Sequence, residues 1–176
     1  MFAMAMAAFV CCFAVRAEAP TRAQLEATFL FKFLQYVEWP SRAFPGVDAP
    51  YIIGVLGNDP VAASLDEIVA GEQLKGRRIE TRHCSTVSQV GRCHVLFIAS
   101  SEAARLPSIL DKLKGRSILT VSDSPDFAQR GGMIGFFDQD RKIRFQINMD
   151  AAQGAGLSIS SKLLQLAQIV HTSERR

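Results

Sequence analysis

Two adjacent His-Cys pairs, His83-Cys84 and Cys93-His94, carry the side chains of this sequence best suited to metal binding or thiol chemistry. Zinc sites usually separate their cysteines by two to four residues, and neighbouring residues of a strand point to opposite faces of the sheet. We therefore prefer a disulfide between Cys84 and Cys93, which cysteines so placed are expected to form in an oxidising compartment. Two free thiols and a metal site are the alternatives. We expect no metal and no other cofactor.

The remaining polar residues match no catalytic pattern. Ser100 and Ser101 follow a predicted strand, but the G-x-S-x-G sequence of a nucleophile elbow is absent, and helix capping accounts for both serines. The candidate carboxylate pairs are Asp123 with Asp126 and Asp138 with Asp140. Both pairs lie in turn-rich sequence, where aspartate commonly forms local hydrogen bonds. The sequence therefore predicts a protein that is not an enzyme.

Aromatic residues offer a binding surface instead. Trp39, the single tryptophan, either walls a recessed apolar site with its aromatic neighbours or fills the core beneath the following loop. The turn Gly54–Gly57 resembles a strand-to-helix turn at which ligands bind, although a structural turn is the favoured interpretation. The candidate partner-binding or ligand-binding residues are Tyr36, Trp39, Phe44, Asn58, Phe136 and Phe145.

The amino-terminal residues predict export. Residues 1–15 are almost wholly apolar, and Arg16 is the first charge. This run and the small residues after it are typical of a secretory signal peptide, and the run is shorter than the ~20 residues of a membrane span. We predict a signal peptide over residues 1–17, one domain over 18–176, and a periplasmic location. The alternative is an apolar amino-terminal helix of a cytosolic protein.

The charge balance argues against nucleic acid as a partner. The formal net charge is +3, and removal of Arg16 with the signal peptide would leave +2. The basic residues are scattered, and no aromatic residues alternate with them as a base-stacking platform requires.

Helical and strand-like apolar patterns alternate along the middle of the chain. Predicted helices cover 25–39, 59–69 and 100–114, the last interrupted near Pro107, and a short helix begins at Pro125. Predicted strands cover 51–56, 78–82, 95–99 and 117–121. Pro40 ends the first helix, because proline disfavours helical backbone angles in the residue before it. On this helix Glu26 and Lys32 are placed on the polar side.

Residues 130–170 form a predicted supersecondary unit. Gly131-Gly132 gives backbone freedom at a strand entry. Strands over 133–137 and 142–147 make a β-hairpin with a turn at 138–140. A short helix, capped by Asn148 or Asp150, runs through Ala155 and ends at Gly156. A last helix opens at Ser158 or Ser160, and its stripe is Leu163, Leu164, Ala167 and Val170.

Strands that are apolar throughout and separated by helices indicate a sheet covered on both faces. We therefore predict a single-domain α/β fold with a mixed, mainly parallel sheet flanked by helices, a carboxy-terminal β-hairpin and a final helix. The hairpin offers an edge strand that needs covering, so a homodimer is plausible.

Seven sequence blocks match a known family in order along the chain. The blocks are FLFKFLQYVEWP (29–40), IGVLGNDP (53–60), CHVLFI (93–98), SILTVSD (117–123), FAQRGGMI (127–134), FQINMDAA (145–152) and GLSISSKLLQLA (156–167). With them the chain resembles the YfiR family of bacterial periplasmic proteins. Cys93 stands at the family's frequent cysteine before the third strand, which supports a disulfide role. The chain lacks mature cysteines for the second disulfide pair of the better-known member.

The resemblance implies a periplasmic regulator that binds and represses the sensor region of an inner-membrane signalling protein. The expected target is a diguanylate cyclase that controls cyclic-di-GMP and biofilm growth, or a sensor kinase. A further partner implied by the resemblance is an OmpA-like outer-membrane lipoprotein that sequesters the repressor. The alternative function is a periplasmic small-molecule-binding sensor that acts with a sensor kinase or cyclase.

Overall fold

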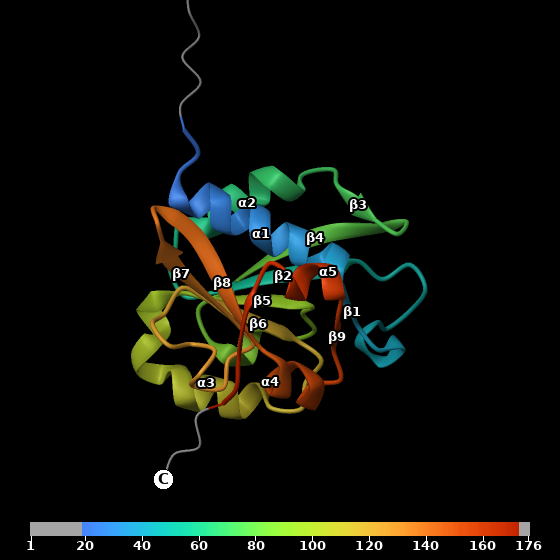
Figure 1. The fold of residues 1–176 in the computed structure, drawn as a ribbon. Coiled ribbons are helices and arrows are strands. Elements are labelled where there is room, and N and C mark those ends of the chain that lie inside the picture. Colours follow the sequence, from blue (N-terminus) through green and yellow to red (C-terminus); the bar gives the residue numbers. More distant parts are fainter. Residues whose placement is uncertain (1–18, 173–176) are drawn as a thin grey trace, which may run out of the picture.

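An eight-stranded sheet runs through the centre of the protein in the computed structural model, which describes residues 19–172 (Figure 1). Its strand order is β10-β8-β7-β6-β5-β2-β4-β3, and β1 and β9 form a separate two-stranded sheet. The strands are β1 (Val37–Glu38), β2 (Tyr51–Leu56), β3 (Gln73–Leu74), β4 (Arg77–Cys84), β5 (Val95–Ile98), β6 (Leu119–Ser122), β7 (Ile134–Gln139), β8 (Lys142–Asn148), β9 (Ser158–Ile159) and β10 (Gln168–Val170).

Helices cover both faces of the sheet (Figure 1). The α-helices are α1 (Arg22–Tyr36), α2 (Val61–Val69), α3 (Leu106–Leu113), α4 (Met149–Gly154) and α5 (Ser161–Leu164), and the 3-10 helices are η1 (Ser41–Ala43), η2 (Val87–Gln89) and η3 (Ser100–Arg105). Strand β5 shows why two layers are needed. Its Val95 and Phe97 pack in the cluster beneath α1 and α2, whereas Leu96 and Ile98 pack in a second cluster with α3. The predicted α/β class with a mainly parallel sheet is confirmed.

Within the run β4-β2-β5-β6-β7, each strand is parallel to the next. From β2 the chain moves one way to β4 and then returns to β5 on the other side of β2, so the winding direction reverses between β2 and β5. In open α/β sheets the carboxyl ends of the strands at such a reversal leave a crevice in which ligands bind. This end of the sheet is therefore the first place to look for a site.

Helix α1 begins and ends at different residues from the prediction. Thr21 and Gln24 form a reciprocal capping box at its amino terminus, which satisfies two backbone N–H groups that the helix cannot. The helix ends at Tyr36 rather than at Trp39, because Val37 and Glu38 pair antiparallel with β9. The pairing partner lies more than a hundred residues away, and helical periodicity does not report it.

The predicted final helix is wrong beyond Leu164. Only α5 is helical there, and Gln168–Val170 form β10, which pairs parallel with β8. The carboxy-terminal segment thereby supplies backbone partners for residues 146–148 of β8, so the predicted open edge of the hairpin is covered along this part of its length. The short helix expected from Pro125 is also wrong, because residues 125–130 form successive turns.

The hairpin is confirmed with a tighter turn than predicted. Gln139 pairs with Lys142, which leaves Asp140 and Arg141 as a two-residue connection with φ of 51° and 59°. Two positive φ values are the signature of a type I′ turn, whose twist matches that of the strands. Asp138 therefore belongs to β7 and extends from the end of the sheet.

Gly131 and Gly132 are required for different reasons. Gly131 has a φ of +98°, as the sequence predicted. At Gly132, by contrast, a Cβ would lie 2.1 Å from the Phe127 ring. This ring is buried against the entry to β7, so only a residue without a side chain fits beneath it.

Among residues 19–172 no helix combines the length and apolar character needed to cross a membrane. The predicted signal peptide, residues 1–17, lies outside the described residues.

Candidate functional site

Three loops meet at the carboxyl ends of β2, β5 and β6, where the winding direction reverses. Gly57, with a φ of +97°, follows β2, and a Cβ there would lie 2.7 Å from Oγ of Ser101 after β5. The backbone N–H of Asn58 donates to the same Ser101 hydroxyl over 3.3 Å. Asp59 Oδ1 accepts a 2.9 Å hydrogen bond from the N–H of Val61, the first residue of α2. Glycine at position 57 lets these two loops approach closely.

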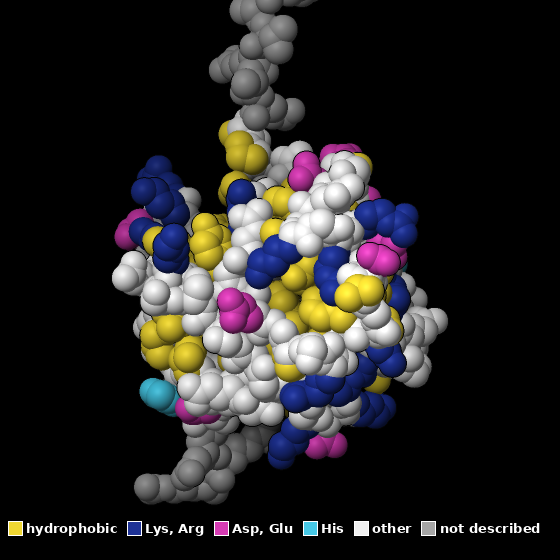
Figure 2. All heavy atoms as spheres, turned by 90° about the vertical axis from the view of Figure 1, so that its right-hand side faces the viewer, with side chains coloured by type: hydrophobic (Ala, Val, Ile, Leu, Met, Phe, Trp, Pro, Cys, Tyr) yellow, Lys and Arg dark blue, Asp and Glu magenta, His cyan; other side chains and the backbone are white. Residues whose placement is uncertain are grey.

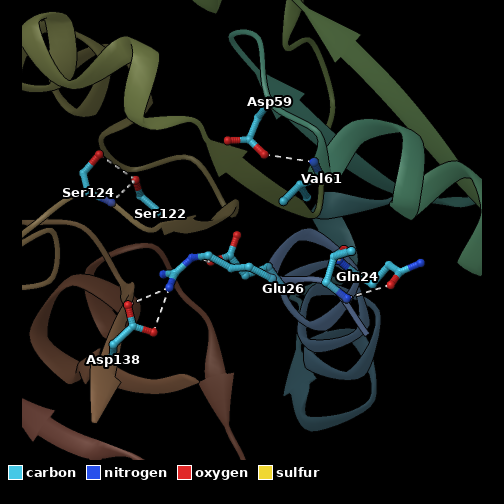
Figure 3. Close-up of polar contacts among 9 residues, drawn as sticks. Gln24, Glu26, Asp59, Val61, Ser122, Ser124 and Asp138 are labelled. Atoms are coloured by element: carbon cyan, nitrogen blue, oxygen red, sulfur yellow. Dashed lines mark hydrogen bonds and ion pairs between the residues drawn. The ribbon is translucent and has the colours of Figure 1, made fainter. Parts of the chain in front are cut away.

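Charged side chains converge on this end of the sheet and form what we call the switch-point cluster. Its members are Arg22, Glu26, Asp59, Asp123 and Asp138. Figure 3 shows Glu26 of α1 between Asp59 and Asp138, with Ser122 and Ser124 of the β6 loop nearby. Helix α1, which covers this face of the sheet, thus brings an acidic and a basic side chain to the strand ends.

Arg22 holds the cluster together. Its Nη1 lies 2.7 Å from both carboxylate oxygens of Asp138, and its Nε lies 2.8 Å from Glu26 Oε1. The contact with Glu26 is an ion pair without an aligned hydrogen bond, since Oε1 is buried and accepts none. Asp123 Oδ1 is likewise buried without a hydrogen-bond partner. Two carboxylate oxygens therefore lack the donors that usually accompany burial.

Burial and like charge shift the acidity of this cluster. Burial, the largest cause, together with the charges of Asp123 and Asp59, raises the pKa of Glu26 to about 7 against the opposing effect of Arg22. Burial and the charge of Asp59 also raise the pKa of Asp123. Such shifts concentrate at functional sites but also occur in structural networks. The cluster can gain or lose a proton near neutral pH and can attract a cationic group.

Glu26 was placed on the polar side of the helix by the sequence analysis, and this is wrong. It is 2% exposed. Leu30, Phe33 and Leu34 are buried on the same helix, and residues spaced three and four apart share one face. The spacing of Glu26 from Leu30 is the signal that could have located it, but charge alone suggested exposure.

A second constellation lies at the opposite end of the sheet, near the start of β2 and β5. Trp39, Phe44, Tyr51 and His94 form a ring cluster with centroids 4.5–6.0 Å apart. Trp39 Nε1 donates to the His94 carbonyl oxygen over 3.2 Å, and the Ile52 N–H donates to His94 Nδ1 over 3.0 Å. The rings pack against each other, and Trp39 and Phe44 are half-buried against the core.

His94 is the polar centre of the ring cluster. It is 2% exposed, and its Nε2 has no hydrogen-bond partner. Because Nδ1 accepts a hydrogen bond, the neutral ring carries its proton on Nε2. Burial, assisted by the charge of Arg77, lowers the pKa of His94 to about 4. The ring is therefore neutral at physiological pH.

We expect acid to weaken the fold through His94. Its folded pKa of about 4 lies below the ordinary histidine pKa of 6.5, so the unfolded chain binds the extra proton first as pH falls between these values. Local opening of the loop before β2 can hydrate the His94 ring before the whole chain unfolds, and this lowers the cost of protonating the ring. The resulting loss of stability is therefore about 1–2 kcal/mol. Urea unfolding at pH 7.5 and 4.5 tests this assignment. On going to pH 4.5, the free energy of unfolding of His94→Gln should change more favourably than that of the parent chain by this amount; equal changes in the two chains contradict the assignment.

The other candidate residues have separate surroundings. Phe136 and Phe145 are each 4% exposed and contact Phe29 and Phe33 of α1. They form core packing, and a partner would reach them only if α1 moved. Tyr36 is half-buried at the end of α1, and Asn58 is exposed at the loop after β2. The structure thus brings Trp39 and Phe44 together but separates them from the hairpin phenylalanines.

The family model described as YfiR/HmsC-like matches residues 23–168, from the start of α1 to the first residue of β10. The chain belongs to the YfiR/HmsC-like family. No curated protein matches the sequence. The family is periplasmic. It is a regulatory rather than a catalytic family, and its general role is the regulation of diguanylate cyclase signalling.

In this YfiR/HmsC-like chain the two described cysteines are buried free thiols. Both belong to the cluster on the α3 side of the sheet. Cys84 pairs in register with Leu56 of β2, whereas Sγ of Cys93 lies 3.0 Å from where a Gly54 Cβ would be, two residues earlier on the same strand. Burial raises the pKa of Cys93 to about 12 and also raises that of Cys84. Thiolate is the reactive form, so both thiols react slowly while buried.

The two histidines beside these cysteines face different surroundings in the YfiR/HmsC-like fold. Nε2 of exposed His83 lies 3.0 Å from Asp66, whereas His94 is enclosed in the ring cluster. Within residues 19–172 no three His, Cys, Asp or Glu side chains are grouped so that they could hold one metal ion.

Proposed function

We propose that this YfiR/HmsC-like protein binds the periplasmic region of an inner-membrane diguanylate cyclase and represses it. The observation that carries the proposal is the family match across residues 23–168, which spans α1 and the whole parallel sheet. Repression requires only that the protein bind the inactive conformation of the cyclase more tightly than the active one. A ligand that shifts a two-state protein from mostly active to mostly inactive needs about a 10⁴-fold difference in affinity.

The test is the cellular concentration of cyclic-di-GMP after deletion of the gene. Deletion should raise cyclic-di-GMP and increase biofilm growth in a strain that carries the cyclase, and expression of the parent chain in the periplasm should restore both. A strain from which the cyclase gene is also deleted is the control. Unchanged cyclic-di-GMP in the single deletion would remove the basis for a repressor.

Cys84 and Cys93 form a disulfide in the periplasm under this proposal. Both thiols lie on the same side of the sheet, but they contact different residues of β2, so pairing requires movement of the segment between them. Closure of such a loop would stabilise the fold by about 3 kcal/mol, less any strain. Intact-mass measurement without reduction tests the pairing: the mass should be lower than that of the reduced chain by the two thiol hydrogens. An unchanged mass means free thiols.

A further inference from the structure

A cavity of about 230 Å³ opens at the amino ends of β5 and β6, at the opposite end of the sheet from the switch-point cluster. Three arginines line it, Arg42, Arg92 and Arg116, together with Cys93 and Ser117. We propose that this arginine cavity binds a compact anion that carries a phosphate group. The inference goes beyond the proposed repressor role and does not depend on it.

The three arginines come from separate parts of the chain. Arg42 lies in η1, Arg92 in the turn before β5, and Arg116 in the turn before β6. None of them belongs to an ion pair between residues 19 and 172, and no carboxylate lines the cavity. Folding thus gathers three positive charges without compensation. Figure 2, seen from the side on which η1 lies, shows Lys and Arg side chains gathered over the lower part of this face.

Hydrogen bonds hold the wall of the cavity that carries Arg92. Arg82 Nη1 donates to the carbonyl oxygens of Val90 and Arg92, each over 2.7 Å. Arg116 Nη2 donates to the carbonyl oxygen of Gly91 between them. The turn is therefore fixed by the protein itself before any ligand arrives, and preorganisation of this kind reduces the free energy lost on binding.

The other wall depends on a close approach between Arg42 and the backbone. A Cβ on Gly156 would lie 2.7 Å from Arg42 Nη2, and Gly156 has a φ of +73°. The Ser117 hydroxyl donates to the Ala155 carbonyl oxygen over 3.0 Å, which ties the turn before β6 to the same segment. The guanidinium of Arg42 thus lies close to Gly156, and the Ser117 hydrogen bond holds the neighbouring Ala155 against the turn before β6.

The size and chemistry of the cavity select the ligand class. Its volume corresponds to about seven or eight water molecules, which suits inorganic phosphate or the phosphate end of a small phosphomonoester. Guanidinium groups bind phosphate oxygens through two parallel hydrogen bonds, which a monovalent halide cannot accept. Cys93 does not compete as an anion, because its buried thiol is protonated and a disulfide sulfur carries no charge. A free metabolite and a lipid headgroup offer the same phosphate chemistry.

Isothermal titration of the purified protein with sodium phosphate and with glycerol 3-phosphate tests the site, with sodium chloride at equal ionic strength as the reference. We expect saturable binding of the phosphate compounds only. The double variant R42Q/R92Q should bind about tenfold more weakly or worse, the effect of losing at least one charge-assisted hydrogen bond. The matched control R78Q/R144Q removes two exposed arginines elsewhere and should leave the affinity unchanged.

Sedimentation with phosphatidylcholine vesicles containing phosphatidylglycerol distinguishes the two sources of phosphate. Vesicle binding that R42Q/R92Q abolishes and the control retains assigns the cavity to a lipid headgroup. Saturable binding of glycerol 3-phosphate in the isothermal titration, without vesicle binding, assigns the cavity to a free phosphomonoester. The proposal is overturned if neither form binds above chloride, or if R42Q/R92Q and R78Q/R144Q lose binding equally. Circular dichroism of both variants confirms that they are folded.

Discussion

Substitution of Asn148 by alanine is expected to lower the free energy of unfolding by about 3–5 kcal/mol. Asn148 is fully buried, and its amide Nδ2 donates to the Ala128 carbonyl oxygen over 2.7 Å and to Thr172 Oγ1 over 2.8 Å. Its Oδ1 accepts from the Ala151 N–H over 3.0 Å and caps α4, as the sequence predicted. Alanine leaves a cavity, removes one of the two hydrogen bonds to the Ala128 carbonyl oxygen and leaves the Ala151 N–H of α4 without a partner.

Urea unfolding followed by circular dichroism measures this effect. Asn58→Ala is the matched control, because Asn58 is exposed on a loop and its loss should change stability by no more than about 0.5 kcal/mol. Asn148→Asp retains the helix cap but places a carboxylate against the Ala128 carbonyl oxygen, so it should also be strongly destabilising. If Asn148→Ala lowers the free energy of unfolding by no more than the control does, the Asn148 side chain does not join the segments that carry Ala128, Ala151 and Thr172.

Replacement of Glu26 by glutamine is expected to stabilise the protein at and above neutral pH by up to about 3 kcal/mol. The folded-state pKa of about 7 is raised above the ordinary glutamate pKa of 4.5. Between these values the unfolded chain has released the proton while the folded chain still holds it, so stability falls as pH rises from 4.5 to 7. Glutamine has the same shape and cannot ionise, so it lacks this penalty. Below pH 4.5 the two chains should differ little.

The same substitution should also reveal the effect of His94 protonation on stability, which is opposite in sign to that of Glu26 protonation. Protonation of His94 destabilises the fold as pH falls from 6.5 towards 4. In nearly the same window, protonation of Glu26 stabilises the fold, because it removes a buried charge and the repulsion from Asp123 and Asp59. In the parent chain the two effects offset each other. E26Q should therefore lose stability on acidification more steeply than the parent, whereas E67Q, an exposed control on α2, should follow the parent curve. Parallel curves for E26Q and the parent contradict the assigned Glu26 acidity.

Local chemistry explains which elements could be predicted. The apolar run at β2, the turn at Gly57, the break near Pro107 and the hairpin strands all follow from short-range patterns, and the structure confirms them. Errors occurred where distant partners decide the conformation. Trp39 lies outside α1 because β9 pairs with Val37 and Glu38, and Gln168–Val170 are extended because the edge of β8 is available.

The candidate sites show the same division. The grouping of Trp39 with Phe44 was predicted from their proximity in the sequence, but the inclusion of His94 was not, since it depends on β2 and β5 being neighbours. Likewise Arg42, Arg92 and Arg116 appear as scattered basic residues in the sequence. Only the parallel arrangement of β5 and β6, with η1 nearby, places them around one cavity.

The short strand β10 shields β8 with only three residue pairs. A chain cut before Gln168 would present the seven residues of β8 as a bare template, to which the same strand of another copy could add. Truncation here is therefore expected to produce polymers rather than a smaller monomer.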